Sequence, residues 1–181
     1  MTVTENEHKE SRTVSTDESP MDLRGEFVAA MATTSTSVHV VSTANPRITM
    51  GVTVSACSSV SADPPILLVC INTRSPVCGA VEANGVFAVN LLSTEQRHIA
   101  ETFAGRAMYG KPFDFSCCEW APGILGVPLI KGAVVSLECR VVDRHTVGTH
   151  SVFFGGVVAV KRAHHAPLLY CRRGYGSFQV L

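Results

Sequence analysis

The pattern of apolar positions predicts that the chain folds, from residue 22 onward, into strands with helices inserted between them. From Asp22 to about Thr34, apolar side chains recur three and four residues apart, which predicts an amphipathic helix at the start of the domain. Residues 38–43 follow as a Val- and Thr-rich run that ends at Asn45-Pro46, and this run predicts a strand.

Residues 48–62 alternate between apolar and polar side chains, which predicts extended structure with one face in the core. The polar positions carry only glycine, hydroxyl groups and one thiol, whereas a solvent-facing strand normally includes Lys, Glu or Arg. Two interpretations stay open. This face is either a surface on which a flat polar ligand lies against the backbone, or an ordinary Ser/Thr-rich strand or barrel interior.

The rest of the chain predicts further strands with two more helices between them. We expect a helix over 77–84 with Ser75 at its N-cap, and a second helix from Ser93 or Thr94 to about Phe103. A loop rich in glycine and proline spans 105–131, and strands are expected over 66–72, 86–92, 134–142, 151–160 and 168–170. Because strands and helices do not alternate one by one, the pattern favours a mainly β, closed or nearly closed barrel.

Charge and composition limit the partners and the number of domains. The 181 residues hold 15 basic and 15 acidic side chains, so there is no electrostatic reason to bind nucleic acid or an anionic membrane. Residues 1–20 contain five acids and only three apolar residues, which predicts a disordered polar tail. We expect one domain over 21–181, with Met21 as a candidate alternative start.

The chain shows no apolar run long enough to span a membrane and no signal peptide, so a cytoplasmic location is expected. Its seven cysteines form no C-x-x-C pair and are expected to be free thiols. The adjacent pair Cys117-Cys118 is either redox-active or ordinary packing. The motifs of Rossmann dehydrogenases, P-loop proteins, serine hydrolases and zinc proteases are all absent, which weakens those readings.

Several segments resemble the flavin reductase family in the right order. They are GVTVSACSSVSADPPILLVCIN, NGVFAVNLLS, ETFAG, VGTHSVFFGGVVAV and PLLYCRRGY, and the resemblance runs from about Phe27 to Tyr175. Members of this family are the reductase components of two-component flavin-dependent monooxygenases. The resemblance implies an FMN-binding split β-barrel and a homodimer. It also implies an enzyme that reduces FMN or FAD with NADH or NADPH and supplies a separate oxygenase with diffusing reduced flavin, for use on an aromatic substrate.

The resemblance also assigns the flavin site. Four consecutive residues match the strand that meets the edge of the flavin ring and the ribityl chain, and two more continue that groove: Thr53, Val54, Ser55, Ala56, Ser59 and Val60. Asn72, Thr73 and Ser75 lie where a strand enters a helix, a place that suits a phosphate. A plain N-cap remains the alternative for Ser75.

Three further matches concern the phosphate, the nicotinamide and the C-terminus. Phe103, Ala104, Gly105 and Arg106 match a Phe-Ala-Gly loop in which Arg106 would neutralise the phosphate, or would simply be an exposed arginine without a partner. Gly148-Thr149-His150 resembles a Gly-Asp-His pattern, with His150 orienting the nicotinamide or merely packing. Thr149 replaces the Asp, which leaves NADH against NADPH open. Tyr175 either closes over a ligand or ends the domain.

Other classes of function remain open beside the reductase. A non-catalytic flavin- or haem-binding module, or an oxidase with bound flavin, could use the same barrel. The Gly148–His150 segment favours turnover, because a module that only held flavin would not need a nicotinamide site. Hydride transfer between two cofactors needs stacked, oriented rings rather than an acid/base pair, and no such pair stands out in the sequence.

Overall fold

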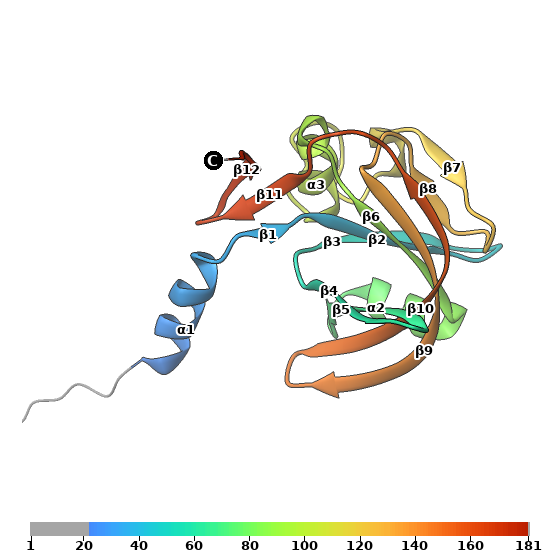
Figure 1. Cartoon of the computed structure of the whole chain (residues 1–181), viewed down its shortest axis with the longest axis horizontal. Helices are drawn as coiled ribbons and strands as arrows, with labels where there is room; N and C mark the ends of the chain where they lie inside the picture. The colour runs from blue at the N-terminus through green and yellow to red at the C-terminus, as the bar shows by residue number, and fades with distance from the viewer. Residues whose placement is uncertain (1–21, 181) are drawn as a thin grey trace, which may run out of the picture.

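A computed structural model describes residues 22–180, so the predicted tail over 1–20 and Met21 lie outside the described residues. Seven antiparallel strands form one strongly curved sheet in the order β3-β2-β6-β9-β10-β5-β4 (Figure 1). A three-stranded sheet, β1-β11-β12, and a two-stranded sheet, β7-β8, lie beside it. The helices are α1 (Leu23–Ala32), α2 (Pro76–Asn84) and α3 (Arg97–Phe103). The strands are β1 (Thr36–Ser37), β2 (His39–Ala44), β3 (Thr49–Val54), β4 (Cys57–Ala62), β5 (Pro65–Asn72), β6 (Val86–Leu91), β7 (Trp120–Pro122), β8 (Pro128–Ile130), β9 (Val135–Val147), β10 (His150–Arg162), β11 (Leu168–Cys171) and β12 (Gly174–Ser177).

The two edges of the large sheet are strands that follow one another in the chain. β3 pairs with β2 and β4 pairs with β5, and only Ser55 and Ala56 separate β3 from β4. The sheet therefore bends almost into a closed cylinder, but it stays open along the seam between these two strands. The predicted mainly β split barrel is confirmed.

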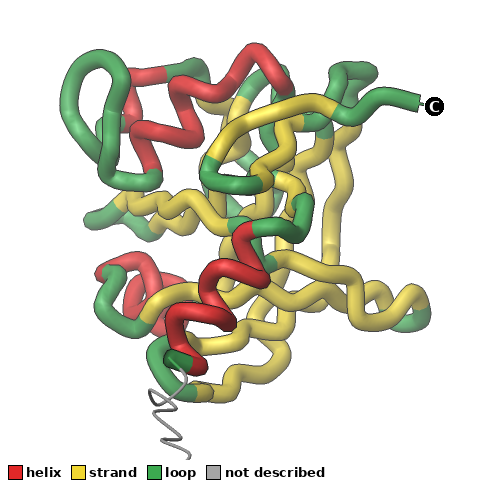
Figure 2. Tube along the Cα trace, turned by 90° about the vertical axis from the view of Figure 1, so that its left-hand side faces the viewer, coloured by secondary structure: helices red, strands yellow, loops and turns green. Residues whose placement is uncertain are grey.

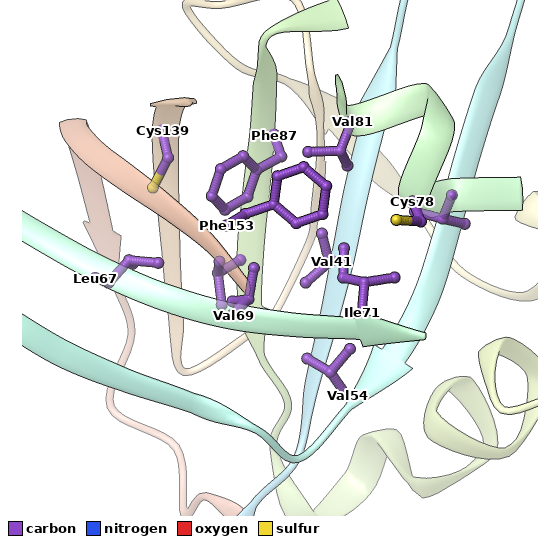
Figure 3. Close-up of a cluster of buried hydrophobic side chains, with 12 residues drawn as sticks. Val41, Val54, Leu67, Val69, Ile71, Cys78, Val81, Phe87, Cys139 and Phe153 are labelled. Carbon is purple, nitrogen blue, oxygen red and sulfur yellow. The ribbon is translucent and has the colours of Figure 1, made fainter. Parts of the chain in front are cut away.

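The barrel encloses an apolar core. Two phenylalanines, Phe87 on β6 and Phe153 on β10, are fully buried at its centre (Figure 3). Gly155 has no side chain at the point where Phe87 crosses β10, and a Cβ there would lie 2.5 Å from Phe87 Cζ. Close packing in this core thus depends on a glycine as well as on the large side chains.

A second apolar cluster lies outside the barrel, between α3, β2 and the C-terminal strands, with Phe103 buried at its centre. Between the clusters, the buried amide of Asn90 donates through Nδ2 to Val40 O and Ser42 Oγ, both at 3.1 Å. Its Oδ1 accepts from Ile130 N–H at 3.1 Å and from Ser136 Oγ at 2.8 Å. This fully bonded amide ties β8 to the barrel wall.

The structure corrects the expectation of one extended segment over 48–62 with a single core face. In β3 the apolar residues Met50, Val52 and Val54 pack in the barrel core, but Val60 on β4 is 48% exposed. The reason is the turn at Ser55-Ala56, which carries the chain from one edge of the sheet to the other. The loop expected over 105–131 contains the short hairpin β7-β8, and Tyr175 lies on a paired strand, β12.

The predicted first helix forms, and the Asp22 carboxylate caps it by accepting from Gly25 N–H at 2.9 Å. None of its residues is buried, and Leu23 and Phe27 are 72% and 63% exposed. Figure 1 shows α1 projecting away from the barrel, and Figure 2, viewed from that side, shows it standing in front of the sheet. Its apolar residues therefore have no core to pack against within one chain. Among the described residues, no helix is long and apolar enough to cross a membrane.

Candidate functional site

A groove of about 700 Å³ lies beside the open edge of the barrel. Three parts of the chain line it: β3, the junction between β5 and α2, and the C-terminal end of α3 with the loop that follows. The lining residues are Thr49 to Thr53, Asn72, Arg74 to Val77, Phe103, Ala104, Phe113 and Phe115. A smaller hollow of about 210 Å³ shares Thr53 and Ala104 with the groove and is otherwise lined by Val38, Val54, Ser55, Arg106, Tyr170 and Tyr175.

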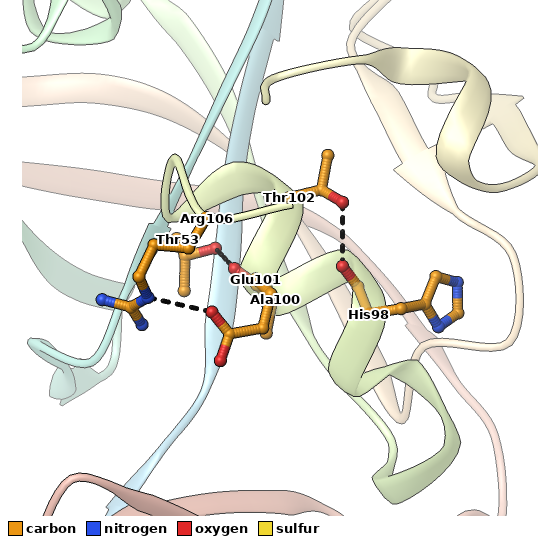
Figure 4. A network of polar contacts seen from close by, with 6 residues as sticks. All are labelled: Thr53, His98, Ala100, Glu101, Thr102 and Arg106. Carbon is orange, nitrogen blue, oxygen red and sulfur yellow. Dashed lines mark hydrogen bonds and ion pairs between the residues drawn. The ribbon is translucent and has the colours of Figure 1, made fainter. Parts of the chain in front are cut away.

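Thr53 stands between the two cavities, and its orientation is fixed by α3. Its Oγ1 donates to the carbonyl oxygen of Ala100 at 2.7 Å (Figure 4). The hydroxyl proton is committed to that bond, so the oxygen can only accept from a ligand. Because β3 pairs only with β2, its outer row of backbone N–H and C=O groups is also available to a ligand. The edge strand thus offers both donors and acceptors along the groove.

Ser75 and Arg74 form the polar end of the groove. Ser75 occupies the N-cap of α2, yet its side chain makes no capping hydrogen bond, so the hydroxyl remains free for a ligand. The plain N-cap alternative accounts for its position but not for its hydroxyl. Arg74 also lines the groove and makes no ion pair within residues 22–180. The helix N-terminus, a free hydroxyl and an unpaired cation together suit an anionic group.

Arg74 was not among the site residues predicted from the sequence. A cation directly before an N-cap serine was a usable signal for an anion site. The other two residues predicted around the phosphate have local partners. Asn72 lines the groove, but its Oδ1 accepts from Arg74 N–H at 2.9 Å and thereby shapes the turn. Thr73 lies outside the groove, and its N–H donates to Thr149 O at 3.0 Å. Both residues shape the backbone around the site through these local hydrogen bonds.

Arg106 has a charged partner, so the alternative of an exposed arginine without a partner does not hold. Its Nε lies 2.9 Å from Glu101 Oε2, and this hydrogen bond raises the pKa of Arg106 above its ordinary value (Figure 4). Arg106 lines the small hollow together with Tyr175, which packs edge-on against Tyr170 with ring centroids 5.2 Å apart. The charge of Arg106 is therefore already compensated, and its side chain lines the small hollow and not the groove that contains Ser75.

His150 stands at the end of the β9-β10 hairpin. It pairs with Asn72 across the strands, and Gly148 makes the turn with a φ of 57°. The imidazole is exposed, so packing does not account for it. Its Nδ1 lies 2.9 Å from Thr149 Oγ1. The hairpin thus holds His150 beside the groove, next to Asn72, without making it part of the lining.

The structure brings together nine of the sixteen predicted site residues. Thr53, Asn72, Ser75, Phe103 and Ala104 line the groove, and Val54, Ser55, Arg106 and Tyr175 join Thr53 and Ala104 around the small hollow. The remaining seven line neither: Ala56, Ser59, Val60, Thr73, Gly105, Gly148 and His150. Ser59 and Val60 are exposed on β4, because that strand lies across the seam from β3.

Cys117 and Cys118 pack against the apolar cluster around Phe103. Burial raises the pKa of both thiols, that of Cys118 to about 12. Both thiols are therefore protonated near neutral pH, which favours the packing interpretation over redox activity. Within residues 22–180, no group of three His, Cys, Asp or Glu side chains is placed to hold a metal.

The two cavities can bind and orient a ligand, and the ionisable side chains in their described linings are those of Arg74, Arg106, Tyr170 and Tyr175. Neither lining, among the described residues, contains Asp, Glu, Lys or His. Hydroxyls, an edge strand, aromatic rings and one free cation define a site for a flat, phosphorylated cofactor that itself carries the chemistry.

Comparisons with known proteins agree with that class. The flavin reductase like domain matches residues 31–179, and the chain belongs to this family. FMN reductase (NADH) RutF 2 of Methylorubrum extorquens is 40% identical over 147 residues, which cover 81% of this chain and 84% of that protein. The resemblance and the enzyme class inferred from the sequence are confirmed.

Solved structures give the same result. The NADH:FAD oxidoreductase SgcE6 of Streptomyces globisporus, in complex with NAD and FAD fragments, superposes with a TM-score of 0.80 at 28% identity and covers 89% of this chain and 95% of its own. BorF is the flavin reductase component of a bacterial two-component tryptophan halogenase. It superposes with a TM-score of 0.78 at 28% identity and covers 87% of this chain and 99% of its own.

Proposed function

We propose that this flavin reductase uses NADH to reduce FMN or FAD in the groove and releases the reduced flavin to a separate oxygenase. The observation that carries the site assignment is that Arg74 and the free hydroxyl of Ser75 share one groove with the unpaired edge of β3. A flavin nucleotide matches these two parts of the groove, because it has an anionic phosphate end and a flat ring with polar edges. RutF 2 is named for FMN and NADH, and SgcE6 was solved with NAD and FAD fragments.

The residues present fit such a cofactor. Arg74, Ser75 and the first turn of α2 would hold the phosphate, while Thr53 and the outer backbone of β3 would bond the ring edge and the ribityl chain. Val54, Ser55 and Ala104 extend the same surface into the small hollow. When bound, the flavin supplies the redox chemistry by accepting hydride from the dihydronicotinamide.

The chain's own contribution is orientation and the exclusion of water. His150 would bond the nicotinamide at the mouth of the groove, beside Asn72. Phe103 and Phe115 give the groove an apolar wall on the α3 side, with ring centroids 5.0 Å apart. Two rings held face to face at about 3–3.5 Å need no general acid or base, which agrees with the lining.

We also propose that the protein is a homodimer. The exposed apolar side chains of α1, which include Leu23, Phe27 and Met31, stand on a helix with no buried residue. The helix is tied to its own chain at its C-terminal end, where Arg172 N–H donates to Ala32 O. An exposed apolar helix of this kind is typical of an interface, and a second copy would cover it in a symmetric pair.

We further propose that the partner of this reductase is a separate oxygenase. BorF is a reductase component that serves a tryptophan halogenase, and this supports an oxygenase partner with an aromatic substrate. The balanced charge of the chain favours transfer of reduced flavin by diffusion rather than through a salt-sensitive complex, in a cytoplasmic setting. A tight complex with the oxygenase in a pull-down experiment would contradict transfer by diffusion.

The decisive test is the nicotinamide absorbance in air. The protein is mixed with NADH and either FMN or FAD, and we expect consumption well above the rate without protein. Flavin binding without NADH consumption would instead support the non-catalytic binding module. Parallel assays with NADPH decide between the two nicotinamide cofactors.

A further inference from the structure

Phe113 differs from the other large aromatic residues near the groove. Phe103 is fully buried and Phe115 is half-buried, whereas the Phe113 ring is 52% exposed while lining the groove. A phenylalanine ring in such a position presents a flat apolar face to whatever occupies the groove. About half of the Phe113 surface is left uncovered by the chain itself.

The backbone of Phe113 makes this exposure more unusual. Its φ is 59°, in the left-handed region that bulky residues rarely adopt because the backbone is strained there. The conformation is fixed by the chain around it, because Phe113 N–H donates to Thr102 O at 3.0 Å. A glycine would adopt the same backbone without strain.

Gly105 gives the Phe113 ring its seat. A Cβ at Gly105 would lie 3.2 Å from Phe113 Cζ, and Gly105 itself has a φ of 80°. The glycine of the Phe-Ala-Gly segment therefore leaves space for the ring to lie over the end of α3. The loop thus holds a half-exposed aromatic side chain at a defined place, on a strained backbone.

We propose that Phe113 supplies the stacking face for an aromatic ring of the flavin nucleotide, an inference that rests on the proposed flavin site in this groove. The phosphate end is set by Arg74 and Ser75, which line the same groove. Two rings of a flavin nucleotide share the required chemistry: the isoalloxazine of FMN and FAD, and the adenine of FAD. Stacking on an aromatic side chain suits either one.

The test separates binding from folding by substituting Phe113→Gly. Glycine relieves the backbone strain, so the melting temperature is expected to stay the same or to rise. Loss of the stacking face is expected to raise the flavin Kd about threefold to tenfold. Tyr109→Gly is the matched control, since Tyr109 is 77% exposed in the same loop and does not line the groove. It should leave the Kd unchanged.

Two conservative variants test the ring itself. Phe113→Trp is expected to retain affinity, while Phe113→Leu keeps the apolar bulk and the backbone strain but should bind as weakly as the glycine variant. Titrations with FMN, FAD and ADP identify the ring. Equal losses for FMN and FAD assign the isoalloxazine, and losses confined to FAD and ADP assign the adenine.

Other outcomes overturn the proposal. If Phe113→Gly binds every ligand like the wild type, the ring does not stack on the cofactor. If Phe113→Leu binds as tightly as the wild type, the role is apolar packing. If the glycine variant melts well below the wild type and Phe113→Trp restores stability without affinity, the role is structural. In each case the wild type still oxidises NADH with flavin, whereas a wild type that neither binds flavin nor oxidises NADH contradicts the proposed function itself.

Discussion

Thr149 Oγ1 lies 2.9 Å from Nδ1 of His150 at the tip of the β9-β10 hairpin. The Gly-Asp-His pattern that Gly148-Thr149-His150 resembles has an Asp at this position, and in this chain a neutral hydroxyl contacts the imidazole instead. Within the described part of the chain, Nε2 of His150 makes no hydrogen bond, and this nitrogen is therefore available to a ligand. We propose that Thr149 positions the imidazole ring for the nicotinamide.

Replacing Thr149 tests that contact. Thr149→Val keeps the shape of the side chain and removes the hydroxyl, so His150 loses its orienting partner. We expect kcat/KM for NADH to fall about threefold, while Thr149→Ser stays near the wild type. Flavin affinity, measured by fluorescence quenching, should not change in either variant. Equal rates for the valine and serine variants would exclude the positioning role.

His150→Ala should affect the nicotinamide step and leave flavin binding alone. The loss of one hydrogen bond to a neutral ring costs on the order of 0.5–1.5 kcal/mol, which predicts a threefold to tenfold fall in kcat/KM for NADH. Ser55→Ala should show the reverse pattern, with weaker flavin binding and normal rates at saturation. Anaerobic stopped-flow reduction measures the first effect. If the His150→Ala variant binds flavin more weakly but reduces it at the normal rate once flavin is saturating, His150 belongs to the flavin site and not to the nicotinamide site.

Arg74 and Arg106 form a matched pair for testing the phosphate site. Arg74 lines the groove without an ion pair in the described chain, whereas Arg106 is held by Glu101. Arg74→Gln is expected to weaken FMN binding about tenfold and to leave riboflavin, which lacks the phosphate, nearly unaffected. Arg106→Gln should change the FMN affinity much less. If Arg106→Gln weakened FMN binding more than Arg74→Gln, the phosphate would be assigned to the small hollow instead of the groove.

The sequence predicted the barrel because long apolar runs and their turns are local signals. The helix over 77–84 appears as α2, with Gly85 closing it at a φ of 66°. The interruption at Ser55-Ala56 could not be seen, because both residues continue the alternation and only the pairing of β3 and β4 with different strands separates them. Strand pairing is a property of the whole sheet.

Part of the site could be predicted because some of its residues belong to motifs that are local in the sequence. Thr53 lies in an alternating strand segment and Ser75 precedes a helix, and both line the groove. The partner of Arg106 and the role of Phe113 depend on how the loop after α3 returns to that helix, through contacts such as Phe113 N–H to Thr102 O. The way in which a loop folds back onto a helix leaves no periodic signal in the sequence.

The stability of the fold should fall at mildly acidic pH because of His39. Burial lowers the pKa of this imidazole to about 4, and its buried Nδ1 has no hydrogen-bond partner. The unfolded chain, with an ordinary histidine pKa near 6.5, binds a proton in the window between these values while the folded chain does not. The contribution of His39 is therefore complete above about pH 6.5 and is lost as the pH falls toward 4.

Urea unfolding at pH 7.5 and pH 5 measures the effect. The expected loss from His39 is about 2 kcal/mol across that interval. His39→Asn should flatten the pH dependence even where it lowers stability overall, whereas His165→Asn, which alters an exposed histidine, should leave the slope unchanged. Identical slopes in the wild type and the His39 variant would show that His39 titrates normally in the folded chain.

The exposed face of α1 predicts the behaviour of the protein in solution. Phe27→Asp places a charge on a helix face that a second copy is proposed to bury, and burial of an unpaired charge is strongly unfavourable. Sedimentation velocity at micromolar concentration should show a dimer for the wild type and a monomer for this variant. Ile124→Asp is the control, because Ile124 is 73% exposed in the segment between β7 and β8. Figure 1 shows β7 and β8 on the opposite side of the barrel from α1. A wild type that sediments as a monomer, or a Phe27 variant that stays dimeric, would show that α1 does not form the interface.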